Sequence, residues 1–414
     1  MRLGVWIKIA WRNILRSKRR TGLTVFAIAA STGTLFFFAS LNDGFNEQMI
    51  NAAVDLYLSH VSIEPKGFNR KMEVEKRFEL TPRILSEVEA VPGFRHWDAR
   101  VKFMSFASSP RNSTGVLAVG VDPAAARAHS ALPEAIVEGN FLEDSGERVA
   151  SMAIGRDLAE LLHVRLGDKL VLMSQASDGS LANDLFRVRG IFRSGMPELD
   201  RSVVYLPIAA AREFLVYGPN EASELAIFLD SSTRAAAARD ALSTEIHDPD
   251  LEVLSWQELS KELLQWVEMN DFFTFLMVGM LFFVVAVGVI NTLLMAVFER
   301  TRELGIMMAI GTKPHQVVGV VLLESLVLGV LALAIGDAAG WAVTKYYMIH
   351  GIDFSSWSEG LAEFLGSATT VRPVIKERTV TLLTGSVFLV SVLAALWPAV
   401  RAARLRPVEA IRAL

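Results

Sequence analysis

The sequence contains no cysteine among its 414 residues. This absence excludes structural disulfides, thiolate metal sites and cysteine nucleophiles. Charged residues make up only 21% of the chain, whereas hydrophobic residues make up 52%. The chain is too apolar for an ordinary soluble protein and too charged to lie wholly in lipid. We therefore expect one part in a membrane and another in water.

The usual motifs of catalysis are missing as well. There is no G-x-x-x-x-G-K-[ST] phosphate loop, so the chain does not bind ATP in the usual way. The seven histidines are scattered without an H-E-x-x-H pair, and no G-x-S-x-G elbow is present. We predict no catalytic, cofactor-binding or metal site on this chain.

Basic residues gather at the two ends of the chain. Residues 1–20 hold seven basic residues and no acidic one, and residues 401–414 hold four arginines and one glutamate. The positive-inside rule places both termini in the cytoplasm. These residues adjoin apolar segments rather than aromatic-studded grooves, so we expect no nucleic-acid partner.

Four apolar segments are long enough to cross a bilayer, which takes about 20 helical residues. We predict transmembrane helices at 21–41, 272–298, 316–344 and 380–400. The first could instead be a cleaved signal peptide. Its apolar stretch is longer than the roughly 7 to 15 residues of the apolar region of a usual signal peptide, so we expect it to stay as an anchor.

The topology predicts a large extracytoplasmic domain at 42–268, a second outer loop at 345–379 and a cytoplasmic segment at 299–315. Within the large domain, short alternating runs predict strands and other stretches predict helices. The fold class is thus an α-helical integral membrane protein with a large α+β domain. The expected strands are 56–63, 115–121, 169–173, 185–192 and 202–206, and the expected helices are 154–162 and 208–216.

The flanks of the domain predict a helical stalk. Ser255-Trp-Gln-Glu258 has the pattern of a capping box, and residues 256–298 contain no proline. One helix of these residues would be about 64 Å long, roughly twice the hydrocarbon thickness. The alternative is a break near Asn270 and Asp271. The first span can likewise continue to Tyr57, although Gly44 weakens that prediction.

Two polar residues fall within the predicted spans. Asn291 lies near the inner end of the second span and Glu324 lies in the third. An intramembrane carboxylate is costly, so something must retain it. Glu324 could pair with a neighbouring helix or a partner subunit, be protonated, or reach water at the inner interface. We favour a structural or interface role over transport for both residues.

The most specific segment lies between the second and third spans. Residues 299–311 read ERTRELGIMMAIG, followed by Lys313-Pro314. This pattern predicts a short amphipathic helix, with Gly311 and Pro314 as its stop and turn. Its opposite charges and exposed apolar side chains suit docking into a groove on a partner.

This segment resembles the coupling segment of the MacB-like (type VII) ABC transporter permeases, which include the FtsX-like permeases. AWRNILR at 10–16 and WPAVRAARLRPVEAIR at 397–412 match the same family. The resemblance implies mechanotransmission: a separate ATPase dimer, carrying ATP and Mg, binds two permease subunits and moves their outer domains. It assigns ATPase contacts to Glu299, Arg300, Arg302, Glu303, Gly305, Ile306, Ala309 and Gly311.

The outer domain resembles lipoprotein-releasing permeases of the LolC and LolE type, through RVRGIFRSGMPELD at 187–200 and SVVYLP at 202–207. That resemblance implies a bacterial inner-membrane protein, a second permease subunit of the same or a related chain, lipoprotein cargo, membrane lipid and a periplasmic carrier. It also implies a carrier-binding loop, although a Gly-Pro loop is more often a simple turn. The loop comprises Ser194, Gly195, Met196, Pro197, Glu198, Leu199 and Asp200.

Two other functions remain open. The chain could serve efflux together with an adaptor, or act as a signalling scaffold through which an ATPase activates a cell-wall hydrolase. The outer loop of about 227 residues favours lipoprotein release or efflux, because FtsX proper tends to have a smaller one.

Overall fold

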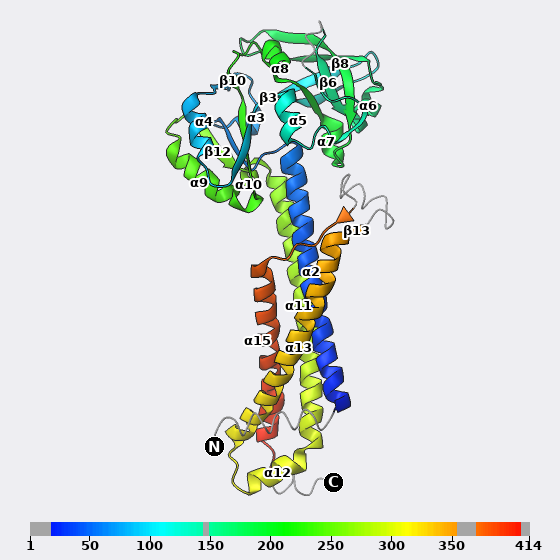
Figure 1. Cartoon of the computed structure of the whole chain (residues 1–414), viewed down its shortest axis with the longest axis vertical. Coiled ribbons are helices and arrows are strands. Elements are labelled where there is room, and N and C mark those ends of the chain that lie inside the picture. The colour runs from blue at the N-terminus through cyan, green and yellow to red at the C-terminus, as the bar shows by residue number, and fades with distance from the viewer. Residues whose placement is uncertain (1–17, 144–148, 354–369, 407–414) are drawn as a thin grey trace. The chain divides into compact units, whose positions relative to one another are not determined.

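The computed structural model describes residues 18–143, 149–353 and 370–406, which form two compact units (Figure 1). One unit gathers the residues up to Asn46, Val267–Ile352 and the residues from Val371 onward. The other contains Glu47–Trp266. The predicted N-terminal basic segment and the end of the C-terminal one, 1–17 and 407–414, lie outside the described residues, as do 354–369 of the second outer loop.

Among the described residues, four helices are long and apolar enough to span a membrane, which confirms the predicted membrane class. The shortest has 27 residues and is about 40 Å long. Helix α12 (Thr301–Ala309) and the short strands β13 (Ile352–Asp353) and β14 (Thr370–Val371) occupy the connections. The four long helices are α2 (Lys18–Leu56), α11 (Lys261–Glu299), α13 (Pro314–His350) and α15 (Glu377–Ala403).

Small residues bring α2 and α13 close together. A Cβ atom on Gly336 would lie 2.7 Å from the Ala29 carbonyl oxygen, and one on Gly340 would lie 2.8 Å from Phe36 Cβ. Gly33 faces the same pair of glycines. Helices in lipid associate through close contact of this small-xxx-small kind, since lipid supplies no hydrophobic drive between them.

We expect Gly336→Ala to lower the thermal unfolding temperature of the detergent-solubilised protein, because the added methyl meets backbone. Overpacking of this kind costs about 1–3 kcal/mol. Gly319→Ala is the matched control on the same helix, since a Cβ there meets nothing within 4 Å. It should be neutral or stabilising, because alanine favours helix over glycine by about 1 kcal/mol. Equal melting of the two variants would contradict the close contact.

The predicted stalk helix begins later than expected. Trp256–Leu259 forms a separate short helix, α10, and Ser260 is extended with φ −129° and ψ 96°. Ser260 Oγ accepts the Leu263 backbone N–H at 3.2 Å, so this serine is the true start signal of α11. The prediction of one helix from Trp256 is therefore wrong by five residues.

The alternative break near Asn270 and Asp271 is absent, and both residues lie within α11. Their side chains instead bond to α2: Asn270 Nδ2 donates to Asn46 Oδ1 at 2.6 Å, and Asn46 Nδ2 donates to Asp271 Oδ1 at 2.9 Å. Polar residues that suggested a break thus join two helices.

Gly44 does not end α2, which continues to Leu56. A Cβ at Gly44 would lie 2.1 Å from the carbonyl oxygen of Arg372, so the glycine admits another stretch of backbone. The Val374 N–H donates to the Ser40 carbonyl at 2.8 Å, and Lys376 pairs with Asp43 at 3.5 Å. The chain entering α15 therefore lies along α2.

The second unit is an α+β domain, as its alternating runs predict, and it is built on a ten-stranded sheet. The strand order is β12-β1-β11-β3-β4-β9-β6-β8-β5, with β7 paired to β3 and β8. The sheet strands are β1 (Val61–Pro65), β3 (Phe94–Ser108), β4 (Ser113–Val121), β5 (Ile136–Gly139), β6 (Ser151–Gly155), β7 (Lys169–Gln175), β8 (Leu181–Phe192), β9 (Val203–Pro207), β11 (Glu224–Leu229) and β12 (Leu251–Ser255). A separate ribbon pairs β2 (Phe78–Glu79) with β10 (Glu221–Ala222).

Helices α3 (Phe68–Lys71), α4 (Pro82–Glu89), α5 (Pro123–His129), α6 (Arg156–Leu162), α7 (Pro197–Ser202), α8 (Ile208–Leu215) and α9 (Ala235–Glu245) complete the domain. Two expected elements need correction. The strand expected from Leu56 begins at Val61, because α2 extends through Leu56. The helix expected from Ile154 begins at Arg156, because Ile154 is a fully buried residue of β6.

Candidate functional site

Local sequence sets the bounds of α12. Helix α11 ends at Glu299, where Arg300 leaves helical geometry with φ −111° and ψ 14°. At the other end, Gly311 has φ +103°, which favours glycine. Pro314 then starts α13, where its missing N–H costs nothing. A nine-residue helix is thus isolated between two spanning helices.

Helix α12 has one buried and one exposed face. Leu304 packs in an apolar cluster with Val317, Val321 and Ala399, which belong to α13 and α15. The opposite side presents an exposed stripe made of Arg302, Ile306, Ala309 and Ile310, spaced as neighbours on one helical face. Ile310 is 80% exposed and Ile306 is 45% exposed. The stripe is thus a mainly apolar exposed surface with one basic residue.

A buried ion pair joins the start of α12 to α13. Arg300 Nη1 lies 3.1 Å from Glu324 Oε2, and the Glu324 side chain is only 8% exposed. Arg300 Nε also lies 3.3 Å from Glu303 Oε2. The arginine therefore holds two carboxylates at the α11–α12 junction. Among the alternatives for Glu324, the structure shows pairing with a neighbouring helix.

The predicted ATPase-contacting residues divide into two groups. Glu299, Arg302, Ile306, Ala309 and Gly311 are exposed. Arg300, Glu303 and Gly305 are partly or fully buried, and Arg300 pairs with Glu324 within this chain. The structure adds Ile310, which was missed, although its i+4 spacing from Ile306 and i+8 spacing from Arg302 could have indicated it.

Asn291 is exposed on α11, away from the other spans of this chain. Its neighbour Thr292 contacts α2, where Thr24 Oγ1 donates to Thr292 Oγ1 at 3.1 Å. At this end of α11 the polar contact to α2 is therefore made by Thr292 rather than by Asn291.

The predicted carrier-binding loop is partly helical. Pro197 begins α7, so only Ser194, Gly195 and Met196 are loop. Asp200 is 4% exposed and accepts the Ser194 N–H at 2.7 Å, so these two residues close the turn. Burial raises the pKa of Asp200. Pro197 and Glu198 are exposed, whereas the buried Asp200 and Ser194 cannot form a contact surface.

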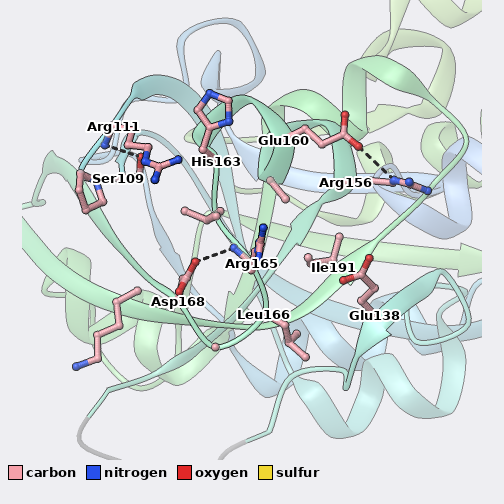
Figure 2. A pocket seen from close by; sticks show the side chains of 15 residues that line it. Ser109, Arg111, Glu138, Arg156, Glu160, His163, Arg165, Leu166, Asp168 and Ile191 are labelled. Carbon is pink, nitrogen blue, oxygen red and sulfur yellow. Dashed lines mark hydrogen bonds and ion pairs between the residues drawn. The ribbon is translucent and has the colours of Figure 1, made fainter.

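A broad groove of about 1340 Å³ lies on the outer domain beside α6 (Figure 2). Arg156 pairs there with Glu160 at 3.5 Å, and Asp168 accepts the Arg165 N–H at 2.8 Å. Both positive and negative side chains line the groove. Within residues 18–143, 149–353 and 370–406, no cluster of histidines and carboxylates could hold a metal ion.

The buried carboxyl group of Glu64 gives the outer domain a pH dependence. Burial, and then the nearby charge of Glu224, raises the pKa of Glu64 to about 8. The folded chain therefore keeps a proton that the unfolded chain releases above its ordinary pKa. Stability should fall as pH rises from about 4.5 to about 8, by roughly 2–4 kcal/mol from this group.

Thermal unfolding of the outer domain in the full chain, followed between pH 5 and 8.5, tests this expectation. Glu64→Gln should flatten the decline, whereas Glu79→Gln, an exposed control, should not. The same slope in all three proteins would refute the assignment to Glu64.

Comparison with known families agrees with this architecture. Residues 21–245 match the MacB-like periplasmic core domain, and residues 275–407 match the FtsX-like permease C-terminal domain. The chain belongs to the MacB-like and FtsX-like permeases, and is an ABC transporter permease of the MacB, FtsX and Lol type.

Two similar relatives match over nearly their full length. The chain is 22% identical to the lipoprotein-releasing system transmembrane protein LolE of Haemophilus influenzae, over 97% of this chain and 98% of the relative. It is 23% identical to the LolC protein of Neisseria meningitidis, over 99% of both. A macrolide export ATP-binding/permease protein MacB of Marinobacter nauticus is 22% identical, over 83% of this chain and 54% of that protein.

Proposed function

We propose that this chain is the permease subunit of a transporter in which a separate ATPase dimer, binding ATP and Mg, drives movement of the outer domain. The observation that carries the proposal is the exposed stripe of α12. Its buried face packs on α13 and α15, and Arg300 ties its start to α13 through Glu324. A push on the stripe would therefore be passed directly to the spanning helices.

We propose lipoprotein release as the function of the transporter. The LolE and LolC relatives match from end to end, whereas the MacB relative is matched over only about half its length. The chain would lie in a bacterial inner membrane, with both termini cytoplasmic and the α+β domain periplasmic. It would work with a second permease subunit, membrane lipid, lipoprotein cargo and a carrier.

A carrier would contact the outer domain at the exposed start of α7, in the middle of the 194–200 segment. Pro197 and Glu198 are exposed there, and Gly155 fixes the segment, because a Cβ at Gly155 would lie 2.1 Å from the Asp200 carbonyl oxygen. Glu198→Lys should weaken carrier capture without affecting assembly. Unchanged capture would remove this contact from the proposal.

Efflux with an adaptor is the second candidate, and the MacB similarity favours it. Purification from native membranes in mild detergent, with mass spectrometry of every companion, separates the two. An ATPase with acylated lipoproteins would support release. An ATPase with an adaptor and no lipoprotein would support efflux, an ATPase with a cell-wall hydrolase would indicate signalling, and no ATPase at all would refute the proposal.

A further inference from the structure

The C-terminal end of α2 is bound by side chains from three separate parts of the outer domain. The last carbonyls of a helix have no partners within the helix. Here four consecutive carbonyls, from Asp55 to Leu58, each accept a side-chain donor. Ser130 Oγ donates to the Asp55 carbonyl at 3.0 Å, and the Tyr205 hydroxyl donates to the Leu56 carbonyl at 2.7 Å.

Arg100 completes this set from β3, near the middle of the sheet. Its Nη1 donates to the Tyr57 carbonyl at 3.1 Å and to the Leu58 carbonyl at 2.7 Å. Arg100 is 3% exposed and Tyr205 is 2% exposed, so water cannot replace either donor. A cation is also favoured at the negative end of a helix.

The charge of Arg100 is balanced within the sheet. Glu224 stands opposite Arg100 in the β3–β11 ladder, and the carboxylate lies 4.0 Å from the guanidinium. Lys102 Nζ lies 2.6 Å from the same carboxylate, and Ser62 Oγ donates to it at 3.1 Å. Burial would raise the pKa of Glu224, but Lys102 and Arg100 hold it below its ordinary value. Glu224 thus balances the buried charge of Arg100, and the Arg100 Nη1 is committed to the end of α2, although the Arg100 Nε has no hydrogen-bond partner among the described residues.

The network has a mechanical consequence, because α2 is one uninterrupted helix from Lys18 to Leu56. Its first part belongs to the membrane-type unit and its last turns belong to the outer domain. A helix transmits displacement along its axis only if its far end is fixed to what it moves. Charge-assisted hydrogen bonds from a buried arginine supply that fixation.

We propose that Arg100 and Tyr205 are positioning residues that fasten the end of α2 to the outer sheet and so transmit ATP-driven movement to the outer domain. The inference rests on the proposed function, since it assumes an ATP-driven movement of α2. It predicts that loss of either donor separates ATP hydrolysis from outer-domain motion.

The test uses the purified complex with its ATPase in lipid nanodiscs. The chain has no cysteine, so Arg111→Cys with Glu377→Cys, both exposed, gives a specific spin-label pair that reports on both units. The distance distribution is measured with and without ATP and vanadate, alongside ATP hydrolysis and thermal unfolding. Arg100→Met and Tyr205→Phe should each lose the ATP-dependent shift in distance while ATP hydrolysis stays within about twofold of the parent.

Two control variants distinguish loss of the α2 contacts from a general loss of stability of the outer domain. Tyr217→Phe removes a hydroxyl bond of 2.6 Å to the Val74 carbonyl, and Arg212→Met removes a bond of 2.8 Å to the Glu221 carbonyl, both in the same domain. These variants should keep the shift even where they melt at the same temperature as Tyr205→Phe.

A full shift in Tyr205→Phe and Arg100→Met would overturn the inference, and so would equal loss in the two controls. If Arg100→Met does not fold, Tyr205→Phe decides alone, because it removes one oxygen atom. A parent complex that hydrolyses ATP without any shift would refute the proposed function itself, and the inference with it. Failure of the proposed function is therefore distinguishable from failure of the inference, because it is seen in the parent complex without any variant.

Discussion

Replacing Glu324 by lysine is expected to reduce the yield of folded, monodisperse protein about tenfold or more, whereas glutamine should be tolerated far better. Lysine would place a second cation about 3 Å from the Arg300 guanidinium, in a site that is 8% exposed. Breaking a buried pair costs about 3–5 kcal/mol, because the remaining charge is left uncompensated. Glutamine keeps an oxygen acceptor, and Glu303 still neutralises the arginine.

Size-exclusion chromatography and thermal unfolding in detergent give the measurement. Glu268→Lys is the control, because it makes the same charge change at an exposed position of α11. The double exchange Arg300→Glu with Glu324→Arg should recover much of the lost yield, since it restores opposite charges. Equal loss in the glutamine and lysine variants would instead indicate a role that needs the carboxylate itself.

The Arg300–Glu324 pair also shows what sequence could and could not supply. The number of spanning helices followed from the four long apolar stretches, because each has at least the roughly 20 residues that a helix needs to cross a bilayer. The pairing did not follow, since the two residues lie 24 positions apart and meet only where the start of α12 lies beside α13. A carboxylate in a predicted span indicated that a partner exists, without indicating which one.

Breaks within the long helices α2 and α11 were predicted least well, and tertiary contacts explain why. Gly44 suggested a break but admits the backbone of Arg372, and Asn270 and Asp271 suggested one but bond to Asn46. In each case a tertiary contact overrode local preference. The break that does occur, at Ser260, carries the usual N-cap residue, so the sequence contained that signal.

The sequence predicted the α+β class of the outer domain but not the order of the strands in its sheet. The sequence runs located five of the ten sheet strands within a few residues, and they missed β3, β5, β6, β11 and β12. Strands β6 and β11 are buried along their whole length, so no apolar–polar alternation marks them. The sheet order joins β1 to β11 and β12, which come from the far end of the domain. Non-local pairing of this kind is not encoded in any short stretch, and the contacts around Arg100 depend on it.

The exposed stripe of α12 leads to the second large effect: Ile310→Asp should weaken binding of the ATPase by roughly 30-fold or more. Burying an isoleucine against a partner contributes about 1.5–3 kcal/mol, and an unpaired carboxylate in the same contact costs more. The side chain is 80% exposed in the free chain, so the substitution should leave the fold and melting temperature unchanged. ATPase retained on the immobilised permease, measured across ATPase concentrations, gives the affinity.

Two controls make the result specific to the stripe. Ile310→Leu should bind nearly as well as the parent, because it keeps the apolar surface. Val137→Asp places the same charge on a 51% exposed position of the outer domain and should not affect binding. If Ile310→Asp binds like the parent, the ATPase does not dock on this face. The buried side of α12 would then serve only to pack the inner ends of α13 and α15, and the coupling surface would have to lie elsewhere on the chain.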